Sequence, residues 1–235
     1  MGRVAAILID RKRDDRFHSD TPRLLHPCAG RPLWRWAHDA ALAAGAKDVL
    51  LVGDAGAALT GSLDCVASLD EALIRLGQVS GYLLLYADAP LLMGMDLAAL
   101  IQEGSDAGSA RLPRLLDEDG RSIDDMESAF AYVPAAARAI LKGLPGQSLL
   151  PKSAKAGVSA VEADYYEATL RVLDRRDLAD AEACLRQRIL DAHLEAGVTF
   201  VDPSTCYVDA EVRLGRDTVV HPFSFLSGDT HIGKG

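Results

Sequence analysis

The C-terminal part of the chain repeats an apolar residue every six positions, and this period limits the possible folds more than any other feature. A hexapeptide repeat predicts a β-helix, in which each turn of the chain stacks its inward aliphatic side chain on that of the turn below. An ordinary β-meander with a turn every six residues is the alternative. The repeat continues unchanged to the last residues, IGKG, whereas solenoids normally end in an atypical capping repeat. We therefore expect the natural protein to continue beyond Gly235. The repeat consists of Val208, Leu214, Val220, Leu226 and Ile232.

A different pattern fills residues 1–173. Short apolar runs such as VAAILI and GYLLLY alternate there with helical patterns such as PLWRWAHDAALAAGA. Strands that are apolar on both faces and separated by helices predict a mostly parallel sheet that is covered on both sides. We therefore expect an α/β domain over this range. An amphipathic helix over 174–197, with Asp174 or Asp177 as its N-cap, then leads into the repeat region, 198–235.

Composition argues against several classes of protein. The 235 residues carry a formal net charge of −9, which repels phosphate backbones, so we expect no nucleic-acid partner. No apolar run approaches the length of a membrane span, and the N-terminus lacks a secretory pattern. The four cysteines show no CxxC spacing, and the six histidines form no ligand pair. We expect reduced thiols, a cytoplasmic location and no membrane partner.

The first apolar run, from Val4 to Ile9, leads into a loop without glycine. Loops at this place in α/β proteins commonly bind phosphate, and glycine lets their backbone N–H groups come close to the anion. Here no glycine occurs between Leu8 and His26, and six charged residues in succession occupy 10–15. The loop therefore lacks the close backbone donors on which a phosphate site usually depends.

Three stretches carry a resemblance to one family: SDTPRLLHPCAGRPL at 19–33, LLLYADAPLL at 83–92, and the segment from 177 to the end. On these stretches the chain resembles the bifunctional bacterial N-acetylglucosamine-1-phosphate uridylyltransferase/glucosamine-1-phosphate acetyltransferases, the GlmU family. The resemblance implies a nucleotidyltransferase domain of Rossmann-like α/β build, a linker helix, and a left-handed β-helix that forms a homotrimer and carries the acetyl-CoA site. This chain would hold only the opening coils of that β-helix, so its acetyltransferase centre would be incomplete.

The resemblance also implies a reaction, with UTP and N-acetylglucosamine-1-phosphate as substrates and Mg²⁺ as the cofactor of an active enzyme. The sugar phosphate attacks the α-phosphorus of UTP, so catalysis consists mainly of positioning and charge neutralisation. Residue by residue, the family's signature arginine falls on Arg16 and its lysine on Arg23, the two candidate catalytic cations. The magnesium-binding aspartate falls on Asp88. The second metal ligand falls on Leu173, whose side chain has no oxygen to offer.

The nucleotide loop departs most from the family's pattern. Asp14 and Asp15 stand where polyphosphate oxygens would lie, and two like charges about 4 Å apart cost on the order of 1 to 4 kcal/mol. The uracil-contacting segment keeps little of the family's pattern at 64–73, and the sugar-binding turn falls at about 128–130. The expected nucleotide-binding positions are Leu8, Ile9, Asp10, Arg11, Lys12 and Arg13.

These observations leave three functions open. The first is a nucleotidyltransferase homologue with weakened or lost activity that serves as a non-catalytic platform for oligomerisation of the β-helix acyltransferase half. The second is a working sugar-1-phosphate nucleotidyltransferase in which the side chains of 11–13 and Arg16 bind phosphates. The third is a module that holds a nucleotide or sugar phosphate without turnover. The enzyme hypothesis requires the loop to fold over the carboxyl edge of the sheet, where ligands of open α/β sheets bind.

Overall fold

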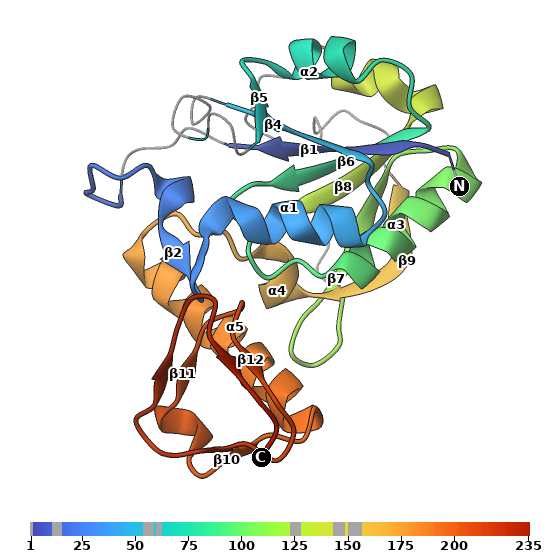
Figure 1. Cartoon of the computed structure of the whole chain (residues 1–235). Coiled ribbons are helices and arrows are strands. Elements are labelled where there is room, and N and C mark those ends of the chain that lie inside the picture. The colour runs from blue at the N-terminus through green and yellow to red at the C-terminus, as the bar shows by residue number, and fades with distance from the viewer. Residues whose placement is uncertain are drawn as a thin grey trace.

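A large α/β part, a long helix and a small group of paired strands follow one another along the chain (Figure 1). The predicted α/β class with a mostly parallel, Rossmann-like sheet is confirmed for the first part. The structure is a computed structural model that describes residues 2–10, 16–53, 59, 63–122, 128–142, 149 and 157–235.

A seven-stranded sheet forms the centre of the α/β part, with the strand order β5-β4-β1-β6-β8-β7-β9. Strand β8 pairs antiparallel with β6 and β7, and the other neighbouring strands pair in parallel. The strands are β1 (Val4–Ile9), β4 (Asp48–Val52), β5 (Asp64–Val66), β6 (Gly81–Tyr86), β7 (Arg111–Leu116), β8 (Phe130–Pro134) and β9 (Gly157–Asp164).

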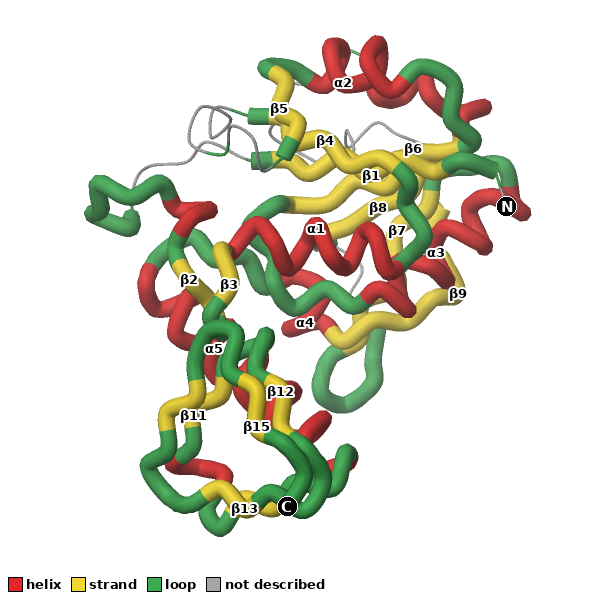
Figure 2. Tube along the Cα trace, viewed as in Figure 1, coloured by secondary structure: helices red, strands yellow, loops and turns green. Residues whose placement is uncertain are grey.

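Helices cover both faces of this sheet, which explains why β1 and β6 consist of buried residues only. Helices α1 (Leu33–Ala43) and α3 (Gly94–Ala107) pack against each other on one face (Figure 2). Helix α2 (Leu69–Leu76) and the 3₁₀-helix η3 (Ala135–Leu141) lie on the opposite face, where Arg138 of η3 donates a hydrogen bond to the carbonyl oxygen of Leu73. A short helix, α4 (Tyr165–Thr169), follows β9 directly.

The topology of the sheet has a switch point between β1 and β6. The chain leaves β1 through α1 to reach β4 on one side, and later returns to β6 on the other side of β1. At such a point, two loops diverge from the carboxyl ends of adjacent parallel strands and leave a crevice in which ligands of open α/β sheets bind. A functional site is therefore expected at the residues that follow β1 and β6.

The predicted long helix is α5 (Arg175–Glu195), and Asp174 is its N-cap. The Asp174 carboxylate accepts hydrogen bonds from the backbone N–H groups of Arg176 (2.8 Å) and Asp177 (3.1 Å), while the Asp177 carboxylate accepts one from the Asp174 N–H. These bonds satisfy donors that the first turn of a helix leaves without a partner, an arrangement known as a capping box. Within the described residues, no helix is both long and apolar enough to cross a bilayer.

The C-terminal strands pair in parallel as three short two-stranded ladders, β10 with β13, β11 with β14, and β12 with β15. Each apolar residue of the predicted six-residue period is the second residue of one of these strands, so the sequence period is also the structural period. The strands are β10 (Thr199–Phe200), β11 (Tyr207–Val208), β12 (Arg213–Leu214), β13 (Val219–Val220), β14 (Phe225–Leu226) and β15 (His231–Ile232).

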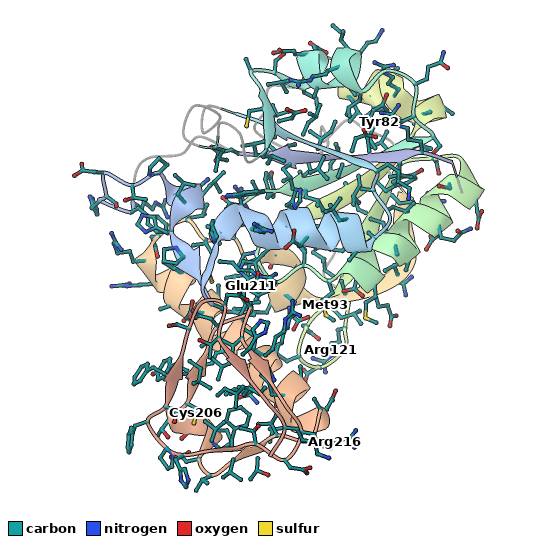
Figure 3. All side chains as sticks on the ribbon, in the orientation of Figure 1. Tyr82, Met93, Arg121, Cys206, Glu211 and Arg216 are labelled. Atoms are coloured by element: carbon teal, nitrogen blue, oxygen red, sulfur yellow. The ribbon has the colours of Figure 1, made fainter. Side chains whose placement is uncertain are left out.

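A small hairpin of the α/β part, β2 (Pro27–Cys28) and β3 (Arg31–Pro32), meets the C-terminal strands. The backbone N–H of Ala210 donates to the Ala29 carbonyl oxygen (3.0 Å), and Arg31 pairs with Glu211 (2.7 Å), which lies at this junction (Figure 3).

Gly30, in the turn of this hairpin, has φ +79°, and a Cβ at this position would lie 2.4 Å from Cγ of Asp209. Only glycine fits there, because a side chain would meet both a strained backbone and a steric clash.

We predict that Asp174→Ala lowers the urea midpoint of unfolding at pH 7, whereas Asp180→Ala, an exposed position on the same helix, leaves it nearly unchanged. The backbone N–H groups of Asp177 and Arg176 lower the pKa of Asp174. A carboxyl with a lowered folded-state pKa stabilises the fold above its unfolded pKa, about 3.9, and loses this contribution as the pH falls through the folded-state value. The gap between the wild-type and Asp174→Ala midpoints should therefore close below about pH 4. A gap that stays constant with pH would contradict this role of the carboxylate.

Candidate functional site

Four charged side chains meet at the carboxyl ends of β1 and β6. Asp88 accepts two hydrogen bonds from Arg171, from Nε to Oδ1 and from Nη2 to Oδ2, each 2.7 Å long. Nη2 of Arg23 lies 2.9 Å from Oδ2 of Asp88 and 2.9 Å from Oδ1 of Asp10. Arg23 thus bridges the two carboxylates, and Arg171 holds Asp88 from a second direction. We call Asp10, Arg23, Asp88 and Arg171 the charge cluster.

Each member of the charge cluster is positioned by a different segment. Asp10 directly follows β1, and Asp88 follows β6, so the parallel pairing of these strands places both carboxylates at one edge of the sheet. Arg23 begins the 3₁₀-helix η1 (Arg23–Leu25). Arg171 lies shortly before α5, where the N–H of Val172 donates to the carbonyl oxygen of Asp88 (2.8 Å). The cluster therefore joins the sheet, the 19–33 segment and the approach to the long helix.

The charge cluster is largely buried. The Asp88 side chain is 0% exposed and that of Arg171 10% exposed, while Arg23 and Asp10 are each 16% exposed. The guanidinium carbon of Arg171 also lies 3.6 Å from the ring centroid of Tyr86, a cation–π contact. Two carboxylates and two guanidinium groups balance in charge, as buried ions must. Burial raises the pKa of Asp10, the nearby Arg23 opposes that rise, and the Asp88 carboxylate adds to it.

The charge cluster does not fit the magnesium ion that the family resemblance implies. Both oxygens of Asp88 are engaged by guanidinium groups, and the predicted second ligand position is Leu173, an aliphatic residue. Mg²⁺ requires near-octahedral oxygen coordination, so one carboxylate already held by two arginines is a poor ligand set. Across the described part of the chain, no group of three or more His, Cys, Asp or Glu side chains could hold a metal ion. The assignment of Asp88 as a metal ligand stays a prediction that this geometry disfavours.

The predicted nucleotide-binding positions divide into three groups. Leu8 and Ile9 are buried in β1, with their side chains in the core. Asp10 belongs to the charge cluster. Residues 11–15, which include the predicted phosphate-binding side chains of Arg11, Lys12 and Arg13, lie outside the described residues. Nucleotide binding by these positions therefore stays a prediction.

The two predicted catalytic arginines lie in different surroundings. Arg16 is exposed and forms an isolated parallel β-bridge with Asp174, the N-cap of α5. Its positive charge is a minor cause of the lowered pKa of Asp174, after the backbone hydrogen bonds. Arg23, by contrast, is mostly buried between Asp10 and Asp88. Only Arg16 is thus exposed to solvent, and a catalytic role for either residue stays a prediction.

The predicted sugar-binding turn at 128–130 lies beside the end of β6. The backbone N–H of Tyr86 donates to the Ala129 carbonyl oxygen (3.0 Å), and the Ser128 hydroxyl accepts a hydrogen bond from the Phe130 N–H (3.1 Å). All three residues of the turn are buried. Their described polar contacts therefore serve the fold of the strand edge.

Sequence reasoning missed the role of Arg171. The residue opens the RVLDR segment, in which the family resemblance points only to the ligand position at Leu173. A leucine at the expected ligand position is itself a signal, since a buried carboxylate without a metal needs another positive charge. An arginine two residues before that leucine was the nearest candidate.

Sequence comparisons relate the whole chain to one group of proteins. No protein-family model matches the sequence. Bifunctional protein GlmU from Caldanaerobacter subterraneus subsp. tengcongensis is 28% identical over 293 aligned positions, which cover 100% of this chain and 63% of that protein. Bifunctional protein GlmU from Pelobacter propionicus is 30% identical, with 100% and 64% covered. The chain thus spans slightly less than two thirds of the length of these relatives. The alignments are longer than this chain, so the relatives contain segments that it lacks.

Solved structures with a similar fold include Rv0371c from Mycobacterium tuberculosis H37Rv, with a TM-score of 0.60 and 21% identity over 77% of this chain and 97% of that one. The same protein in complex with manganese gives a TM-score of 0.57. CMP:2-keto-3-deoxy-manno-octonic acid synthetase in complex with CTP gives a TM-score of 0.52 and 14% identity, over 79% of this chain and 99% of that one. At such identities the likeness concerns the fold alone.

We predict that Arg171→Met destabilises the protein by about 3 to 5 kcal/mol, because it leaves the buried Asp88 carboxylate with one partner fewer. Arg114→Met is the matched control, since Arg114 pairs with Glu162 at 3.7 Å on the surface and its loss should cost no more than about 1 kcal/mol. Urea unfolding of both variants and the wild type measures the difference. Equal destabilisation of the two variants would show that the buried pair is worth no more than a surface pair.

Proposed function

We propose that this chain, a GlmU-like protein that corresponds to the N-terminal part of its relatives, joins three units. These are a nucleotidyltransferase-type domain over 1–173, a linker helix over 174–197, and the first coils of a left-handed β-helix over 198–235. The parallel ladders at the C-terminal end support the third unit, because partners in β11 and β14, and in β12 and β15, lie 18 residues apart, which is three six-residue repeats per coil.

We infer further that uridylyl transfer from UTP to N-acetylglucosamine-1-phosphate, the reaction implied by the family, is weakened or lost in this chain. The observation that carries this inference is the saturation of Asp88 by Arg23 and Arg171. In-line phosphoryl-type transfer depends on positive charge placed against the phosphates, commonly by Mg²⁺. Here the two guanidinium groups neutralise the chain's own carboxylates, so their charge is not directed at a substrate. The domain then acts mainly as a folded platform for the β-helix half.

Retention of ligand binding without turnover is the second candidate. It is favoured by the position of the charge cluster at the switch point of the sheet and by the exposed Arg16 near the same edge. A phosphate that binds there would meet cationic side chains where the family uses backbone amides. Calorimetry with UTP separates this candidate from the platform, because a platform gives no heat of binding.

We predict that the wild-type chain, supplied with UTP, N-acetylglucosamine-1-phosphate and Mg²⁺, releases pyrophosphate no faster than the Asp88→Asn variant. The reason is that a saturated Asp88 contributes nothing to metal binding, so its replacement removes no catalytic power. A coupled pyrophosphate assay measures both proteins, with folding of the variant checked by circular dichroism. Release by the wild type at least tenfold above the folded variant would establish a working enzyme.

Self-association through the C-terminal coils, as a homotrimer, is part of the proposal. Large apolar side chains are exposed there: Phe223 is 76% and Phe225 72% exposed, and the Phe225 ring stacks on Tyr207 with 5.0 Å between centroids. Exposed apolar patches of this kind commonly mark protein–protein contacts. The guanidinium carbon of Arg186, a residue of α5, lies 4.5 Å from the centroid of the Tyr207 ring.

We predict that the double variant Phe223→Asn/Phe225→Ser sediments as a smaller species than the wild type at equal concentration. Asparagine is chosen because Phe223 has φ +60°, which asparagine tolerates. Ile74→Ser is the control, because Ile74 is 78% exposed but lies on α2 of the α/β part. Analytical ultracentrifugation compares the three proteins. A wild-type monomer, or equal dissociation of the control, would refute association through the coils.

A further inference from the structure

One nitrogen atom of the charge cluster lies between its two carboxylates. Nη2 of Arg23 lies 2.9 Å from a carboxylate oxygen of Asp10 and 2.9 Å from one of Asp88. We propose that Asp10 and Asp88 form a divalent-cation position that this chain has closed with its own guanidinium groups, with Arg23 in the place of a bridging ion. The proposal does not depend on nucleotide binding, since it concerns the metal alone.

The geometry of the two carboxylates supports this proposal. They come from the ends of adjacent parallel strands and face a common point, which the bridging nitrogen fills. A divalent cation bound by two carboxylates would sit at such a point, with shorter distances of about 2.0 to 2.6 Å to oxygen. Removal of the Arg23 side chain would therefore leave two oxygen ligands aimed at one space.

The balance of charge between the two carboxylates and the two arginines also supports a divalent-cation position. Asp10 and Asp88 together carry two negative charges in a mostly buried place, and Arg23 with Arg171 supplies two positive ones. One divalent cation would provide the same neutralisation as the two arginines. Nη2 of Arg23 occupies the point between the two carboxylates, so an ion cannot take that place without displacing Arg23. The wild-type chain should therefore bind no divalent cation at this position.

The test uses Mn²⁺ as the probe and the full chain, and follows free Mn²⁺ by electron paramagnetic resonance. The signal of free Mn²⁺ should be equally high with the wild type and with the Asp88→Asn variant, because neither binds the ion at this position. The double variant Arg23→Met/Arg171→Met should bind about one Mn²⁺ per chain, at least tenfold more tightly than the wild type, and should lose this binding when Asp88→Asn is added. Mn²⁺ should also raise the urea midpoint of the double variant, because a ligand that binds only the folded state stabilises it.

The controls keep each outcome decisive. Arg114→Met removes a surface arginine of the same sheet and should gain no Mn²⁺ binding. If the double variant folds only in the presence of Mn²⁺, that dependence supports the proposal directly. If it does not fold with the metal either, the single variant Arg23→Met, which keeps Arg171 on Asp88, replaces it and should still gain Mn²⁺ binding over the wild type.

Two results would overturn the proposal. The first is Mn²⁺ binding by the wild type that Asp88→Asn abolishes, because the position would then be open. The second is a folded arginine variant that binds Mn²⁺ no better than Arg114→Met. The first result would also remove the ground on which weakened uridylyl transfer is inferred, whereas the second would leave it standing. The pyrophosphate assay is a separate measurement, so failure of the proposal and failure of the proposed function can be told apart.

Discussion

The buried carboxylate of Asp88 is the constraint on which the arrangement around the switch point depends. A charge that is 0% exposed must be neutralised within the protein, and here the neutralising groups come from two segments distant in sequence, one at Arg23 and one at Arg171. The pairing therefore fixes where the 19–33 segment and the approach to α5 meet the sheet. The groups that neutralise Asp88 thus also hold these segments together.

This pairing also connects the sheet to the long helix through backbone contacts. Val172 is hydrogen bonded to the main chain of Asp88, and two residues later Asp174 caps α5. The helix then passes the hairpin at Ala29, whose N–H donates to the Glu182 carboxylate (2.5 Å). Burial and the nearby Glu182 raise the pKa of the adjacent Cys28 thiol, which keeps it in the neutral form. Polar contacts thus link the end of β6, the long helix and the hairpin that meets the C-terminal strands.

The sequence predicted the parts of the structure that follow from local periodicity. The runs VAAILI and GYLLLY are apolar at every position and became strands buried on both faces, and the six-residue period became the spacing of the C-terminal strands. Motif comparison also named Arg23 and Asp88 as candidate site residues. It did not predict that they touch, because that contact depends on how η1 folds back over the strand ends. Arg171 was missed for the same reason: its partner is 83 residues away in the chain and no periodic pattern links them.

The glycine turn of the small hairpin sets how closely the α/β part and the C-terminal strands approach each other. Asp209 lies so close to Gly30 that no side chain can enter between the hairpin and the coils, and Arg31 and Glu211 pair beside this contact. The same short segment carries Arg23 at its other end. The segment from Arg23 to Arg31 therefore makes two separate contacts: it pairs with Asp10 and Asp88 at the strand ends, and it packs against the C-terminal strands.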